Sequence, residues 1–288
     1  FIYDDGVVGR IDEDRFHVTT PTGGAARVMA HMEDYLQTEF QELNVWLTST
    51  SEQWAVIALN GPSARRVLEP LIDDIDLDKD AFPHMGVRLG HMLGVPVRLF
   101  RVSFTGELGF ELNAPAEYGL AIRRALLAAG QPNDITTYGT EAMHVMRAEK
   151  GYIIVGQDTD GTVPPNDAGM GWAIGKKKKD FVGKRSLSRP DIEAANCKQL
   201  VGLRTVEPLF VVDEGAQVLP AEGADGPIGH VTSSYWSAAL NRSIALALVE
   251  GGHESIGSAV RVTTDGAPVD AEICDTVFYD KEGTRVNG

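Results

Sequence analysis

The first 150 residues alternate between strand-like and helix-like patterns of apolar side chains. Val28, Met32, Tyr35 and Leu36 recur at helical spacing with polar residues between them, which predicts an amphipathic helix after a short β-type run at 16–20. The other strands predicted in this part are 54–59, 96–102 and 109–113. The other helices are a short one that begins at Pro62 and carries Val67 and Leu68, and the segments 117–129 and 138–150. Strands and helices mixed in this way predict an α+β fold.

The pattern changes beyond residue 199, where only short strand-like runs remain. These runs are 200–204, 229–233, 243–249, 259–263 and 271–279. Turn residues such as Gly251-Gly252 and Asp265-Gly266 separate them, which predicts a small C-terminal β-barrel or β-sandwich. A polar segment at 184–196 precedes the runs, so the predicted domains are 1–190 and 191–288.

Composition narrows the choice of partners and compartment. The chain has 288 residues, with 26 Lys+Arg against 41 Asp+Glu and a formal net charge of −15. Such acidity argues against nucleic acid, because phosphate binding needs clustered cations. The one basic run, Lys176–Lys179, is typical of a solvated loop, although it could also face an anionic ligand tail or partner.

Other classes of protein are excluded by what the chain lacks. No apolar stretch approaches the length of a membrane span, and the two cysteines, Cys197 and Cys274, are too few for a disulfide framework or a zinc cluster. The seven histidines are scattered, so no metal site is expected. We therefore expect a cytoplasmic protein that binds neither a membrane nor a metal.

An acidic segment at 103–113 is the first candidate for chemistry. If the segment from Gly109 is extended, Glu107, Glu111 and Asn113 lie on one face, and the apolar residues between them lie on the other. Spacing alone favours a hairpin with an acidic solvent face. The functional alternative is a carboxylate aimed at the paired N–H donors of a ligand.

Two further groups of residues are open to both structural and functional interpretations. Strand alternation puts Asp4 and Asp5 on opposite faces, so at least one could point inward to meet a cationic species, or both could be exposed at a frayed terminus. For Arg147 and Glu149 we favour a structural ion pair or a solvated face. We expect Trp172 in the core.

Several segments together resemble the folate-binding aminomethyltransferase family, which includes the T-protein of the glycine cleavage system. They are Tyr3-Asp4-Asp5-Gly6, the run from Phe104 to Glu111, Arg147-Ala148-Glu149-Lys150-Gly151, and Gly229-His230-Val231-Thr232-Ser233. A closer similarity is to the C-terminal region of the sarcosine oxidase alpha-subunit family, carried by the segments 22–28, 144–151, 154–162 and 231–237. The resemblance spans essentially the whole chain.

The resemblance implies a T-protein-like folate-binding domain that lacks its N-terminal part, followed by the barrel. It implies tetrahydrofolate as the ligand, with a one-carbon unit captured from flavin-dependent demethylation as 5,10-methylenetetrahydrofolate. The family's catalytic aspartate matches Asp5, its pterin-binding glutamate matches Glu111, and its aromatic residue beside the pterin matches Phe104. Thr19 and Thr20 fall near its pterin-contacting strand.

The chain also departs from the family pattern. An arginine that T-proteins use near folate falls on Met143, and an asparagine falls near Pro21. No dinucleotide fingerprint is present, so FAD, FMN and NAD are expected only on absent segments or on other sarcosine oxidase subunits. A standalone aminomethyltransferase and a structural fragment with an incomplete folate pocket are the competing hypotheses.

Overall fold

The computed structural model describes residues 1–190, 192, 197–223 and 226–288. Contacts between Cα atoms divide the chain into two units. We call residues 4–138 and 283–288 the sheet unit, and residues 1–3 and 139–282 the barrel unit. Contacts thus group 139–190 with the barrel, and the sequence boundary between residues 190 and 191 stays a prediction.

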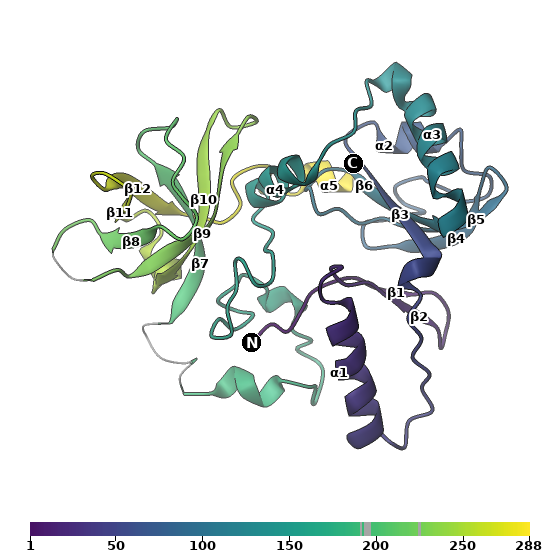
Figure 1. The fold of residues 1–288 in the computed structure, drawn as a ribbon, viewed down its shortest axis with the longest axis horizontal. Helices are drawn as coiled ribbons and strands as arrows, with labels where there is room; N and C mark the ends of the chain where they lie inside the picture. Colours follow the sequence, from purple (N-terminus) through teal and green to yellow (C-terminus); the bar gives the residue numbers. More distant parts are fainter. Residues whose placement is uncertain (191, 193–196, 224–225) are drawn as a thin grey trace. The chain divides into compact units, whose positions relative to one another are not determined.

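The sheet unit is built around a four-stranded antiparallel sheet in the order β3-β6-β5-β4 (Figure 1). The strands are β3 (Trp54–Asn60), β4 (Val87–Met92), β5 (Val95–Phe100) and β6 (Gly109–Pro115). Two helices cover one face, α2 (Ala64–Leu68) and α3 (Gly119–Gly130). Short 3₁₀ turns occupy Ser51–Gln53, Ala116–Tyr118 and Gln131–Asn133, and the short helix α5 (Thr284–Asn287) also belongs to this unit.

Alternation along β6 separates the core of the sheet unit from its other face. Phe110 is 0% exposed and Leu112 is 1% exposed, and both pack with apolar residues of α2 and α3. Glu111 and Asn113 therefore lie on the opposite face. The predicted division of this segment is confirmed, but the solvent-face interpretation is wrong, because Asn113 is 1% exposed and Glu111 is partly buried.

The N-terminal segment of the sheet unit forms a short antiparallel pair and a helix. The pair consists of β1 (Val8–Arg10) and β2 (Phe16–Val18), and the helix α1 (Ala25–Thr38) follows it. The helix confirms the periodicity seen in the sequence, yet none of its residues is fully buried.

The barrel unit contains a closed barrel of six strands in the order β10-β7-β12-β11-β8-β9 (Figure 1). The strands are β7 (Lys198–Thr205), β8 (Gln217–Pro220), β9 (Gly229–Ser237), β10 (Arg242–Glu250), β11 (Ala259–Val262) and β12 (Val269–Cys274). The unit also has the helix α4 (Thr140–Glu149) and 3₁₀ turns at Gly171–Ala173, Lys184–Ser188 and Gly252–Ser255. The predicted α+β fold and C-terminal barrel are confirmed.

Side chains outside the cores add three findings. Trp172 is 76% exposed, so its predicted place in the core is wrong. The lysines of the run Lys176–Lys179 are all exposed, as expected for a solvated loop. Within the described residues, no helix is both long enough and apolar enough to cross a membrane.

Candidate functional site

The face of the sheet that carries Glu111 is partly covered by the β1–β2 pair. Glu111 lies opposite Ala58 of β3 and opposite Phe100 of β5. Gly9 of β1 packs against the Phe100 ring so closely that an added Cβ would lie 2.5 Å from its nearest carbon, Cε1. The ring of His17 in β2 lies 5.8 Å from the same ring. The strand pair therefore brings the N-terminal segment to the face of Glu111.

His17 also attaches the β1–β2 pair to strand β5 through a contact with Arg98. Arg98 of β5 places a guanidinium nitrogen 2.9 Å from His17 Nδ1 and stacks 3.9 Å from the Trp54 ring centroid. Burial, and then the charge of Arg98, lower the pKa of His17. The imidazole is therefore held neutral, with Nδ1 accepting a hydrogen bond from the guanidinium.

Glu111 is a partly buried carboxylate without a counter-ion in the part of the chain that the structure describes. Burial raises its pKa. Burial, and after it the charge of Glu111, raise the pKa of Tyr138, whose hydroxyl accepts a hydrogen bond of 2.6 Å from Asn60 Nδ2. Asn60 and Tyr138 thus join Glu111 in one polar group. Sequence reasoning missed both, although Asn60 stands at the end of a predicted strand and before Gly61-Pro62, where functional side chains often lie.

The two aspartates at the N-terminus have different environments. Asp4 is 8% exposed, forms an ion pair of 3.1 Å with Arg27, and accepts the backbone N–H of Asp5. Gly24 makes room for this carboxylate, because a Cβ there would lie 1.7 Å from Asp4 Oδ2. Asp5 has no ion pair among the described residues. Burial and the charge of Asp4 raise its pKa.

The remaining predicted site residues have mixed surroundings. The hydroxyl of Thr19 accepts a hydrogen bond of 3.2 Å from the backbone N–H of Val7, in the same N-terminal segment. Thr20 bonds to the carbonyl of Pro21 at 3.2 Å. Phe104 lies partly buried in the loop between β5 and β6. The sheet unit therefore contains all five predicted residues, Asp5, Thr19, Thr20, Phe104 and Glu111, and their roles stay predictions.

The glycines of the loop before β6 serve the packing of the chain itself. Gly106 has a φ of +76°, which disfavours any other residue. A Cβ at Gly109 would lie 2.5 Å from both Asn60 Oδ1 and the carbonyl of Val102. The close approach that the sequence indicated is therefore at least partly an approach of backbone to backbone and to Asn60.

The Arg147 motif forms a buried network in the barrel unit. Arg147 and Asp158 are an ion pair with both side chains 0% exposed. Asp158 also accepts hydrogen bonds from Thr232 and Ser233 at 2.6 Å each, and Ser237 donates to Glu149 at 2.5 Å. The structural interpretation of Arg147 is confirmed, because these bonds join α4 and its following loop to strand β9.

Together these features define an α+β protein with a four-stranded antiparallel sheet and a C-terminal six-stranded barrel. No group of three or more His, Cys, Asp or Glu side chains that could hold a metal occurs among the described residues. Residues 1–178 match the GCVT N-terminal domain family, and residues 198–280 match the glycine cleavage T-protein C-terminal barrel domain family. The chain therefore belongs to the GCVT family of folate-binding aminomethyltransferase domains.

Individual relatives fall into two groups. The chain is 47% identical over its full length to the sarcosine oxidase subunit alpha of Corynebacterium sp. (strain U-96), and 39% identical to that of Rhizobium meliloti. It spans 30% of the length of these relatives. It is also 30% identical to an aminomethyltransferase of Symbiobacterium thermophilum, covering 96% of this chain and 73% of that protein.

A solved structure confirms the fold independently. The glycine cleavage system aminomethyltransferase T from Bartonella henselae superposes with a TM-score of 0.81 at 22% identity. The match covers 96% of this chain and 72% of that chain.

Proposed function

We propose that the chain is the tetrahydrofolate-binding part of a sarcosine oxidase alpha subunit. In this role it captures the one-carbon unit released by flavin-dependent demethylation of sarcosine as 5,10-methylenetetrahydrofolate. The observation that carries the proposal is a pair of partly buried carboxylates, neither of them ion-paired in the described residues. Glu111 lies on β6 opposite Phe100, and Asp5 lies in the segment that leads into β1, whose Gly9 packs against the Phe100 ring. Partly buried carboxylates without an ion pair are typical of sites that bind a ligand.

The polar groups around Glu111 fit the pterin part of tetrahydrofolate. A pterin presents adjacent N–H donors, and an ionised carboxylate can accept two of them side by side. Glu111 has no ion-pair partner within the described residues, and Asn60 and Tyr138 add an amide and a hydroxyl nearby. Phe104, in the preceding loop, is our candidate for the aromatic surface beside the ring.

Asp5 has the properties needed at the reacting end of the ligand. Bound tetrahydrofolate supplies the amine that accepts the one-carbon unit. The Asp5 carboxylate would orient this amine and stabilise positive charge that develops on the one-carbon group. Because Asp4 is already paired with Arg27, Asp5 is the member of the pair that is available for this role.

Amine oxidation itself we assign to other parts of the assembly. FAD, FMN and NAD would be bound by segments or subunits outside this sequence, which carries no dinucleotide fingerprint. The other sarcosine oxidase subunits are therefore the proposed partners. No disulfide joins Cys197 and Cys274 within the described residues, which is compatible with the proposed cytoplasmic location.

The test separates oxidation from one-carbon capture in the complete oxidase. Asp5→Asn should leave the rate of sarcosine oxidation unchanged and lower the formation of 5,10-methylenetetrahydrofolate by about 10²-fold, with formaldehyde released instead. Asp14→Asn, an exposed aspartate in the turn between β1 and β2, is the matched control. If the folded Asp5→Asn enzyme loses amine oxidation, the proposed division of labour is wrong.

A second candidate is a standalone folate-dependent aminomethyltransferase, favoured by the 73% coverage of the Symbiobacterium protein. It predicts that the chain without partners converts tetrahydrofolate in the presence of an aminomethyl donor. The sarcosine oxidase proposal predicts turnover only when the flavin-bearing parts are present.

A further inference from the structure

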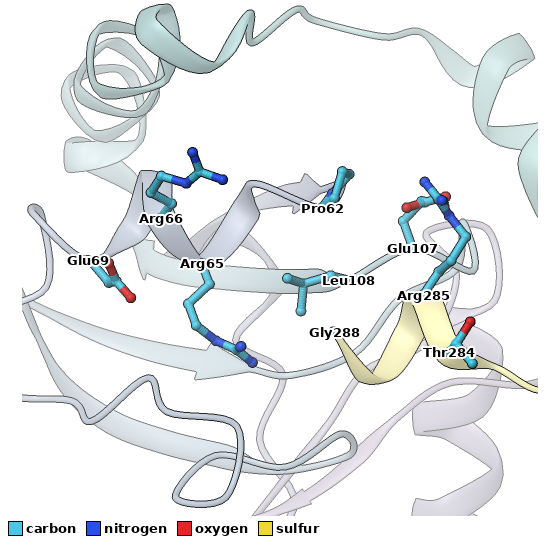
Figure 2. A pocket seen from close by; sticks show the side chains of 9 residues that line it. All are labelled: Pro62, Arg65, Arg66, Glu69, Glu107, Leu108, Thr284, Arg285 and Gly288. Atoms are coloured by element: carbon cyan, nitrogen blue, oxygen red, sulfur yellow. Dashed lines mark hydrogen bonds and ion pairs between the residues drawn. The ribbon is translucent and has the colours of Figure 1, made fainter.

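A pocket with an excess of arginine lies away from the carboxylates described above, within the sheet unit. It has a volume of about 460 Å³ and is bounded by α2, the residues just before β6, and the segment around α5 (Figure 2). Arg65, Arg66 and Arg285 contribute its cations. Figure 2 shows Arg65 and Arg66 leaving α2 in opposite directions, with Arg65 on the side of Gly288.

Within the described residues, the carboxylates at the pocket leave Arg65 and Arg66 without an ion pair. Glu107 accepts a hydrogen bond of 2.5 Å from Arg285 Nε and is committed to that pair. Among the described residues, neither Arg65 nor Arg66 forms an ion pair with Glu69 or with any other carboxylate. The Nε and Nη2 atoms of Arg65 are shielded from solvent and have no hydrogen-bond partner there.

A further arginine lies behind the pocket wall. Arg101 is 1% exposed and donates through Nη2 to the carbonyls of Val286 and Asn287, at 2.8 and 3.1 Å. A Cβ added to Gly288, which lines the pocket, would lie 3.6 Å from the same Nη2. The Nε and Nη1 atoms of Arg101 are buried and have no partner among the described residues.

Arg65 and Arg101 are close enough to repel one another. Burial, followed by the charge of Arg65, lowers the pKa of Arg101. A buried cation without a counter-ion is costly, and two such cations side by side increase the cost. In a chain with a net charge of −15, acidic side chains are abundant, yet the two that line this pocket, Glu69 and Glu107, form no ion pair with Arg65 among the described residues.

We propose that this pocket binds a compact oxyanion, namely a phosphate or carboxylate group. The planar guanidinium group of Arg65 matches the geometry of either group, and Arg101 adds attraction through the low dielectric of the unit's interior. An anion there would offset the charge of both arginines. The pocket is distinct from the proposed folate site, so the two proposals stand or fall separately.

Titration of the full chain with inorganic phosphate tests the proposal. Calorimetry and thermal unfolding are measured at constant ionic strength, with chloride as the balancing anion. We expect saturable binding with one phosphate per chain and a melting temperature that rises with phosphate concentration. Succinate in a parallel titration distinguishes the source, because tighter binding of one anion identifies the phosphate or the carboxylate as the preferred group.

Variants then place the binding at the pocket. Arg65→Gln should weaken phosphate binding about tenfold or more, because a charge-assisted hydrogen bond is lost. Arg124→Gln, an exposed arginine on α3, should bind like the unmodified chain. The proposal is overturned if neither anion binds saturably, or if both variants bind phosphate as the unmodified chain does. Glu111→Gln should leave phosphate binding unchanged, whatever it does to folate.

Discussion

Removal of the Asp158 carboxylate should be among the most damaging single changes in the barrel unit. Asp158 is 0% exposed and holds the equally buried Arg147. It also accepts the hydroxyls of Thr232 and Ser233 and the backbone N–H of Ile154, at 2.6, 2.6 and 2.9 Å. Asp158→Ala leaves a buried guanidinium without its counter-ion and three donors without their acceptor.

The expected loss is about 3–5 kcal/mol in the free energy of unfolding, the usual cost of breaking a buried ion pair by removing one partner. That range is a large share of the roughly 5–15 kcal/mol that stabilises a typical domain. Arg147 keeps its contacts with the carbonyl of Tyr152 and the hydroxyls of Ser233 and Tyr235. These neutral acceptors cannot replace the carboxylate, so they reduce the loss without removing it.

Equilibrium unfolding in urea, followed by fluorescence and far-ultraviolet circular dichroism, measures the effect. Trp236 lies on β9, next to the network, and reports on the barrel unit. Asp275→Ala is the matched control, because Asp275 pairs with Lys281 while its side chain is 45% exposed. The control should shift the midpoint far less, since solvent-exposed ion pairs contribute little.

A double replacement isolates the electrostatic cause. Arg147→Met combined with Asp158→Leu removes both charges and keeps much of the volume, so it should be less destabilising than Asp158→Ala alone. If Asp158→Ala unfolds at the same urea concentration as the control, or if the double variant is the weaker protein, the buried-charge argument is wrong.

Two other predictions concern the sheet unit. Glu111→Gln should weaken tetrahydrofolate binding about tenfold or more in calorimetry. An unchanged affinity would refute the pterin role. The same variant should raise the melting temperature at pH 7 without folate. Burial raises the pKa of Glu111, so the ionised carboxylate of the unmodified chain costs stability at a pH above that pKa. The lowered pKa of His17 gives stability the opposite dependence on pH. The contribution of the neutral imidazole to stability is present above the ordinary pKa of 6.5 and is lost as the pH falls through the lower pKa of the folded state. Melting temperatures between pH 7.5 and 5 should therefore fall less steeply in His17→Gln than in the unmodified chain, and equal slopes would contradict the role of the Arg98 contact.

Local patterns were sufficient for most of the fold. The period-two alternation around Glu111 predicted which side chains of β6 enter the core, because the core against α2 and α3 needs one apolar face. The run of short strands predicted a small barrel or sandwich, and the family resemblance favoured the barrel. Trp172 was mispredicted, because hydrophobic character alone does not distinguish a buried tryptophan from one that is 76% exposed.

The site was less accessible to sequence reasoning, because its parts meet only in three dimensions. Asn60 and Tyr138 are 78 residues apart, and no spacing rule connects an amide at a strand end to a tyrosine hydroxyl. Likewise, strand alternation alone did not distinguish the two adjacent aspartates, and only the family resemblance favoured Asp5. The distinction arises from Gly24 and Arg27, some 20 residues further along, which together accommodate and neutralise Asp4.

In such an acidic chain, the way in which each cation is used carries more information than the net charge. Arg147 and Lys150 are paired with Asp158 and Asp280 and hold the barrel unit together. Arg27 is used to neutralise Asp4, which leaves Asp5 as the carboxylate without a cation. Because Asp5 and Glu111 are partly buried, leaving them without ion pairs has a cost in stability. In the proposed site, a bound ligand with complementary N–H groups and developing positive charge offsets that cost.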